Sequence, residues 1–193
     1  MVRADDPEGR AMIPSDQFVR FYNEVFKALM ERGSESLTAY WRELGRLQCA
    51  ELADRFRRGG LRAAHEYWSR IREEENCEAE LELTQDYFEF RMRRCPSLSK
   101  VLDSDAEPCE LYCDHCMAWV EPLAQAAGLY AVMDMHSRRE PHCTFRLYED
   151  RGKAEAWAAD ARLLSRPYGE PSVEDACRRA QQSARLRNRK ELR

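Results

Sequence analysis

The feature that most constrains the fold is a change in the spacing of apolar residues at Cys77. Before it, apolar side chains recur every three or four residues, which is typical of amphipathic helices. After it, apolar and polar residues alternate along residues 77–84 and again along residues 87–94, which is typical of half-buried strands. Gln85-Asp86 lie between the two runs as a turn, so we predict a β-hairpin that follows a helical region.

The helical region divides at its glycines into three predicted helices. Ser15-Asp16 and Ser36 are suitable N-terminal caps for the first two. Gly33 ends the first helix, and Gly59-Gly60 separate the second from the third, because glycine readily adopts the backbone conformations that end helices.

A second hairpin is predicted downstream, because residues 130–135 and 143–148 have strand character and a turn separates them. Between the two hairpins, residues 97–102 and 109–128 have helical patterns. The chain is therefore expected to form an α+β domain. Its antiparallel sheet has about four strands in two hairpins and packs against several helices, which we expect on one face.

The expected domain organisation has three parts. Residues 1–14 are rich in Asp, Arg, Gly and Pro and are expected to be a flexible N-terminal arm. Residues 15–170 form the α+β domain, with a helical part over 15–76 and a sheet and cysteine-rich part over 77–150. Residues 171–193 are expected to form a C-terminal helix with a basic end.

Charge and hydropathy exclude several classes of function. The net charge of −4 gives no bulk attraction to nucleic acid or to an anionic membrane. No apolar run approaches the roughly 18 residues of a membrane span, and the N-terminus lacks the apolar core of a signal peptide. We therefore expect a cytoplasmic protein with no nucleic-acid or membrane partner. Its eight cysteines are expected to stay reduced.

Residues 87–148 hold five of the eight cysteines, and these thiols have three open interpretations. On a helix over residues 109–128, three cysteines would share one face and point toward a sheet that carries a fourth. Four converging thiolates suit zinc or an iron–sulfur cluster. The thiols could instead be small buried side chains, or one of them could be a nucleophile. The candidate metal ligands are Cys109, Cys113, Cys116 and Cys143.

For the nucleophile interpretation, Cys143 is the candidate thiol at the start of the last strand. A thiolate becomes reactive when a base or a positive field lowers its pKa. His142 points to the opposite face of the strand, so His136 across the turn or His115 on the facing helix is the better-placed base. Asp114 is a candidate to orient an imidazole or to activate water.

Three short motifs resemble the L-2-amino-thiazoline-4-carboxylic acid hydrolase family over residues 87–148. They are Arg94-Cys95 at the end of a strand, Tyr112-Cys113-Asp114, and the run from Cys143 to Leu147. Several positions depart from the family pattern, including the Arg, Thr and Gly that the family has at the turn before the last strand. Cys116 and Thr144 stand where the family has acidic residues, which suggests a different substrate.

The resemblance implies a hydrolase with a small-molecule substrate, which opens a cyclic amidine or cleaves a related C–N bond, with water attacking the ring C=N carbon. We expect no cofactor for this reaction. It casts Cys143 as the key thiol and places Cys95 and Cys113 in the pocket wall. Arg138 or Arg146 would bind the substrate carboxylate. The alternatives are a non-catalytic sensor that binds a ligand, zinc or an iron–sulfur cluster, and a structural protein with buried thiols.

Overall fold

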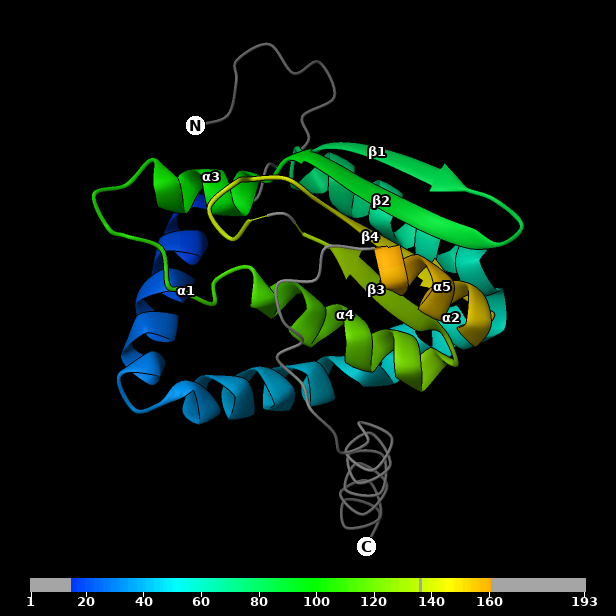
Figure 1. Ribbon diagram of the computed structural model, residues 1–193, viewed down its shortest axis with the longest axis horizontal. Helices are drawn as coiled ribbons and strands as arrows, with labels where there is room; N and C mark the ends of the chain where they lie inside the picture. The colour runs from blue at the N-terminus through cyan, green and yellow to red at the C-terminus, as the bar shows by residue number, and fades with distance from the viewer. Residues whose placement is uncertain (1–14, 136, 161–193) are drawn as a thin grey trace, which may run out of the picture.

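The two predicted hairpins join into one four-stranded antiparallel sheet, which confirms the α+β expectation (Figure 1). The strand order is β1-β2-β4-β3, so the first hairpin meets the second through β2 and β4. Phe90 lies opposite Phe145 across this central pairing. The strands are β1 (Glu78–Leu83), β2 (Tyr87–Arg94), β3 (Tyr130–Asp134) and β4 (Cys143–Tyr148).

In this computed structural model, the described residues are 15–135 and 137–160. The expected N-terminal arm and C-terminal helix lie outside them. None of the helices in these ranges combines the length and the apolar character that crossing a membrane requires. The helices are α1 (Ser15–Met30), α2 (Ser34–Glu74), α3 (Pro96–Leu102), α4 (Asp114–Ala127) and α5 (Arg151–Asp160).

Helix α2 contains both the second and the third predicted helices, with a break where the glycines predict it. Gly60 has φ 56° and ψ −145°, a combination that only glycine adopts without strain. The kink lets the two halves of α2 follow different parts of the fold. The first half packs with α1, and the second half lies against the sheet (Figure 1).

The inner face of the sheet, which we define as the face toward α2 and α4, forms the main core. Phe88, Phe145 and Leu147 project from it and pack against Trp68 of α2 and Leu123 of α4. This burial of apolar side chains is the main source of stability for the fold.

Helices α2 and α4 approach each other closely at Gly45. A Cβ atom at this position would lie 2.9 Å from the carbonyl oxygen of Ala118 and 3.1 Å from Cγ of Pro122. Glycine is therefore required for this packing. Pro122 lies inside α4 and cannot donate an N–H to the preceding turn.

Helices α1 and α3 enclose a second apolar cluster beside the main core. Phe26 of α1 packs edge-on against Trp41, with ring centroids 5.2 Å apart, and it also contacts Tyr112. Tyr112 is almost completely buried, and its hydroxyl lies 2.7 Å from Oγ of Ser97 in α3. This cluster fixes the segment that leads into α4.

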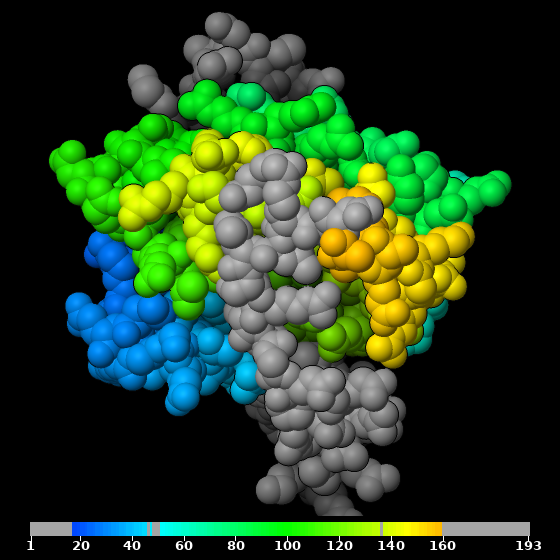
Figure 2. Space-filling view, in the orientation of Figure 1, coloured from blue at the N-terminus to red at the C-terminus, as the bar shows by residue number. Residues whose placement is uncertain are grey.

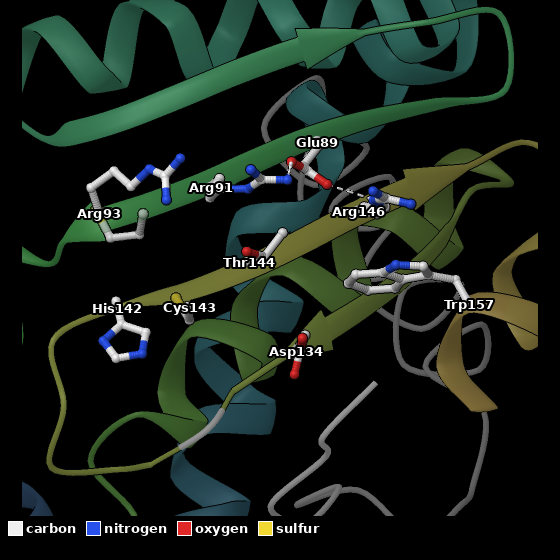
Figure 3. A pocket seen from close by; sticks show the side chains of 10 residues that line it. Glu89, Arg91, Arg93, Asp134, His142, Cys143, Thr144, Arg146 and Trp157 are labelled. Carbon is white, nitrogen blue, oxygen red and sulfur yellow. Dashed lines mark hydrogen bonds and ion pairs between the residues drawn. The ribbon is translucent and has the colours of Figure 1, made fainter. Parts of the chain in front are cut away.

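The outer face of the sheet is partly covered, which corrects the expectation that helices lie on one face only. Helix α5 packs there through Ala154 and Trp157 against Val132 and Tyr148. The rest of this face carries charged side chains of β2 and β4 (Figure 3).

The helix predicted over residues 109–128 is shorter than expected, because α4 begins at Asp114. The side chain of Asn23 explains the difference. Its Oδ1 accepts a hydrogen bond from the Cys109 N–H at 2.8 Å, and its Nδ2 donates to the Glu107 carbonyl at 3.0 Å. Asn23 is buried in α1, so these bonds fix the backbone of Cys109 outside the helix, just before the turn over residues 110–113.

Candidate functional site

Four of the predicted site cysteines line one small cavity between the inner face of the sheet and the start of α4. We call it the sulfur cavity. Its volume is ≈ 30 Å³, about the space of one water molecule. Met133 and Met135 add two thioethers to its wall. The four thiols belong to Cys95, Cys113, Cys116 and Cys143.

The β3–β4 connection lies over the start of α3, next to this cavity. The Cys95 N–H donates a hydrogen bond to the Pro141 carbonyl at 2.6 Å. Figure 2 shows the surface of this connection, in yellow, beside the green surface around α3. Ser137, Glu140 and His142 of the connection line the cavity together with the thiols.

Burial keeps the thiols of the sulfur cavity protonated. It raises the pKa of Cys95 to about 11 and that of Cys116 to about 12. It also raises the pKa of Cys113 and lifts that of Cys143 well above its ordinary value. At neutral pH, therefore, none of these four thiols is set up as a thiolate nucleophile, which opposes the role expected for Cys143.

His115 is one of the predicted bases, and it is held in a neutral state. Burial lowers its pKa, and its ring packs against Phe26 and Tyr112. Its Nδ1 contacts the Tyr112 carbonyl, which can only accept, so Nδ1 carries the proton. Its Nε2 then has a lone pair, and it lies 3.7 Å from Sγ of Cys116.

Asp114 and Arg138 form a buried ion pair with each other. The Arg138 guanidinium donates two hydrogen bonds to the carboxylate at 3.1 Å, and the Asp114 residue is 2% exposed. Burial raises the pKa of Asp114, and Arg138 opposes that effect. The pair fastens the β3–β4 connection to α4. Neither residue is therefore presented to a ligand in the way the sequence suggested.

The expected zinc or iron–sulfur site does not assemble in the described residues. No group of three or more Cys, His, Asp or Glu side chains within residues 15–135 and 137–160 is arranged to hold a metal ion. Cys109 is buried in the α1–α3 cluster and does not line the sulfur cavity. The separation follows from the late start of α4, because the helix that would align Cys109 with Cys113 is absent.

A larger pocket opens on the outer face of the sheet, which we call the outer pocket (Figure 3). Its volume is ≈ 500 Å³, enough for a small metabolite. Strands β2, β3 and β4 supply most of its wall, and α5 closes one end. The charged residues in the lining are Glu89, Arg91, Arg93, Asp134 and Arg146.

Glu89 is the buried centre of the outer pocket, with 3% of the residue exposed. Its Oε2 accepts a hydrogen bond from Nε of Arg146 at 2.6 Å, and its Oε1 pairs with the Arg91 guanidinium at 2.7 Å. A buried carboxylate without such partners would carry a large desolvation cost. Glu89 therefore fixes the positions of two guanidinium groups at the pocket wall.

Arg146 is also held by aromatic rings. Its Cζ lies 4.1 Å from the ring centroid of Tyr87 and 4.7 Å from that of Trp157 in α5. Nη1 donates to the Tyr148 hydroxyl at 3.3 Å. These contacts leave the guanidinium little freedom to reorient, so an anion that binds it costs little side-chain entropy.

The two cavities share one segment of wall. His142 and Cys143 at the start of β4 line both the sulfur cavity and the outer pocket. Cys143 packs with the main core and lies opposite Met92, so its side chain belongs to the inner face. Of the other predicted residues, Arg146 lines the outer pocket, and His136 lies outside the described residues.

Sequence reasoning missed most of the outer pocket, although a signal was available. Glu89, Arg91 and Arg93 occupy alternate positions of β2, and Thr144 and Arg146 do so in β4. Polar residues at every second position along two strands indicate one shared polar face. The strand order then brings these residues together, because β2 and β4 are neighbours.

Comparison of the chain with protein-family models, with curated proteins and with solved structures gave no match.

Proposed function

We propose that this protein binds a small carboxylate-bearing molecule in the outer pocket and hydrolyses it, as the resemblance to L-2-amino-thiazoline-4-carboxylic acid hydrolase implies. The observation that carries the proposal is the arginine-lined pocket of ≈ 500 Å³ built around buried Glu89. The sulfur cavity, at ≈ 30 Å³, is too small for such a substrate.

The guanidinium groups of the outer pocket favour an anion. Three arginines line it with two carboxylates, Glu89 and Asp134, and Arg93 also pairs with Glu80 beside the pocket, so the fixed N–H donors rather than a net charge attract the anion. Arginine binds carboxylates through paired N–H donors, and fixed donors bind more tightly than mobile ones. Arg91 and Arg146 are the proposed carboxylate anchor, because Glu89 holds both.

Water rather than Cys143 is the proposed nucleophile, because the thiol is protonated and belongs to the inner face. The oxygen of water bonds to the amidine carbon, a base takes one proton of the water, and the ring nitrogen of the C=N bond gains a proton. The ring C–S bond then breaks as the new hydroxyl loses its proton and becomes a carbonyl, and the sulfur leaves as a thiolate that accepts that proton. His142 and Asp134 line the outer pocket and are the candidate acid and base.

A second candidate function is binding without turnover. The protonation of all four thiols of the sulfur cavity favours it, because the group that the resemblance casts as reactive is unreactive at neutral pH. The same outer pocket would then serve as the binding site of a ligand sensor.

Turnover of L-2-amino-thiazoline-4-carboxylate separates the two candidates. The purified full chain is expected to release N-carbamoyl-cysteine, detected by liquid chromatography and mass spectrometry. Arg91→Met is expected to lower kcat/KM by about 10–100-fold, the loss of one charged hydrogen bond. Arg70→Met on α2 is the matched control and should retain full activity. Binding without product favours the sensor, whereas neither binding nor product rejects both candidates.

A further inference from the structure

The sulfur cavity contains a pair of thiols that the proposed hydrolysis does not use. Cys113 directly precedes α4, and Cys116 lies in its first turn, separated only by Asp114 and His115. Both cysteines are partly exposed, and both are free thiols. Two thiols with two residues between them at the start of a helix are the arrangement of many dithiol redox pairs.

The backbone brings the two cysteines within reach of each other. The Cys116 N–H donates a hydrogen bond to the Cys113 carbonyl at 3.4 Å, which closes a tight turn. Residues that close such a turn have Cα atoms less than about 7 Å apart. A disulfide spans Cα distances of about 4.4–6.8 Å, so a side-chain rotation can join the two sulfurs without moving the helix.

Each thiol of the pair has a polar neighbour. Nε2 of His115, with its lone pair, lies 3.7 Å from Sγ of Cys116 and can take the thiol proton. Sγ of Cys113 lies 3.7 Å from the Arg138 carbonyl, to which the S–H group donates. Cys95 and Cys143 line the same cavity, so two further thiols adjoin the pair.

We propose that Cys113 and Cys116 form a redox-active dithiol that closes to a disulfide by exchange with a small disulfide molecule. The Cys116 thiol gives its proton to His115 and attacks one sulfur of the small disulfide, which releases one thiolate and leaves a mixed disulfide. The Cys113 thiol then gives its proton to solvent water and attacks Sγ of Cys116, which releases the second thiolate. The two thiolates take up the two protons, one from His115 and one from the solvent. The protein thus loses two hydrogen atoms, and the small disulfide is reduced to two thiols.

The exchange is expected to be slow at neutral pH, because burial keeps both thiols protonated. Its rate should rise about tenfold for each pH unit over the range in which the thiols remain mostly protonated.

The test uses the reduced full chain and glutathione disulfide at mildly alkaline pH, followed by digestion and mass spectrometry. The expected product has lost two hydrogen atoms and has a link between Cys113 and Cys116. Cys113→Ser is expected to stop at a stable mixed disulfide on Cys116. Cys95→Ser, a cavity-lining control, should still form the link. Circular dichroism checks that each variant is folded.

Two results would overturn the proposal. One is a link from Cys113 or Cys116 to Cys95 or Cys143 instead. The other is a wild-type chain that resists oxidation while the unfolded chain is oxidised under the same conditions. Neither result bears on hydrolysis in the outer pocket, so the two proposals fail separately.

Discussion

The buried carboxylate of Glu89 gives the sharpest prediction for the fold and the pocket together. Replacing it with Gln keeps the shape of the side chain and removes the charge that pairs with Arg146 and Arg91. A hydrogen bond to a charged partner contributes about 1.5–3 kcal/mol when it is shielded from water. The Arg146 contact is of this kind, because its side chain is 19% exposed.

The Arg91 side chain is 41% exposed, so solvent screening reduces its contribution to about 0–1 kcal/mol. Glu89→Gln is therefore expected to lower the free energy of unfolding by about 1.5–4 kcal/mol. The assay is urea unfolding followed by circular dichroism. A shift of the midpoint with an unchanged slope reports stability alone.

Glu80→Gln is the matched control for this change. Glu80 lies on β1, the neighbouring strand, and also accepts two hydrogen bonds from an arginine, Arg93, but the pair is exposed. Its substitution should leave the unfolding midpoint close to that of the wild type. Equal effects of the two substitutions would refute the reasoning, because burial would then not decide the strength of these pairs.

Three further predictions concern other parts of the structure. Arg138→Met leaves the Asp114 carboxylate buried without its partner and is expected to lower the free energy of unfolding by about 3–5 kcal/mol at pH 7. Burial raises the folded-state pKa of Asp114 above 3.8, and loss of Arg138 raises it further. The loss of stability should therefore become smaller as pH falls through that raised pKa, because protonation removes the unpaired buried charge. A deficit in urea unfolding that is the same at pH 7 and pH 4 would contradict this. Gly45→Val is expected to lower the free energy of unfolding by about 1–3 kcal/mol, because the new side chain would push α2 away from Ala118 of α4. Gly33→Ala, whose Cβ meets nothing within 4 Å, should lose only the free energy that a positive φ costs an alanine. Iodoacetamide should alkylate Cys95 roughly 100-fold more slowly at neutral pH than a thiol with the ordinary pKa of 9.0, as measured by mass spectrometry, and an ordinary rate would disprove the shift.

The strands were predictable because each has one buried and one exposed face. Alternation over residues 77–84 and 87–94 gives β1 and β2 to within a few residues. The break at Gly60 was predictable as well, because its conformation excludes residues with a side chain. The alternating strands and the helix break at Gly60 are local features, which the sequence of the segment itself determines.

The start of α4 was not predictable, because a residue far away in the sequence decides it. The Asn23 side chain binds the Cys109 N–H across 86 positions of the chain and holds the segment out of the helix. Helical spacing therefore grouped Cys109 with Cys113 incorrectly. Cys95, Cys113 and Cys143, which come from three separate motifs of the sequence, line the sulfur cavity together.

The outer pocket depends on strand order, which local patterns do not determine. Arg91 and Arg146 reach the same carboxylate only because β2 and β4 are neighbours. The position of α5 on the outer face adds Trp157 to the pocket. The sequence therefore predicted a substrate site at the cysteines, whereas the strand order of the structure points to the charged outer pocket.

The most direct test of the central claim is calorimetric titration of the purified full chain with two compounds. One is L-2-amino-thiazoline-4-carboxylate, and the other is 2-aminothiazoline, which has the same ring without the carboxylate. The arginines of the outer pocket predict that the carboxylate binds more tightly, by at least about tenfold, since one charged hydrogen bond contributes that much. Equal affinities, or no binding of the carboxylate, would contradict the assignment of the outer pocket as the substrate site.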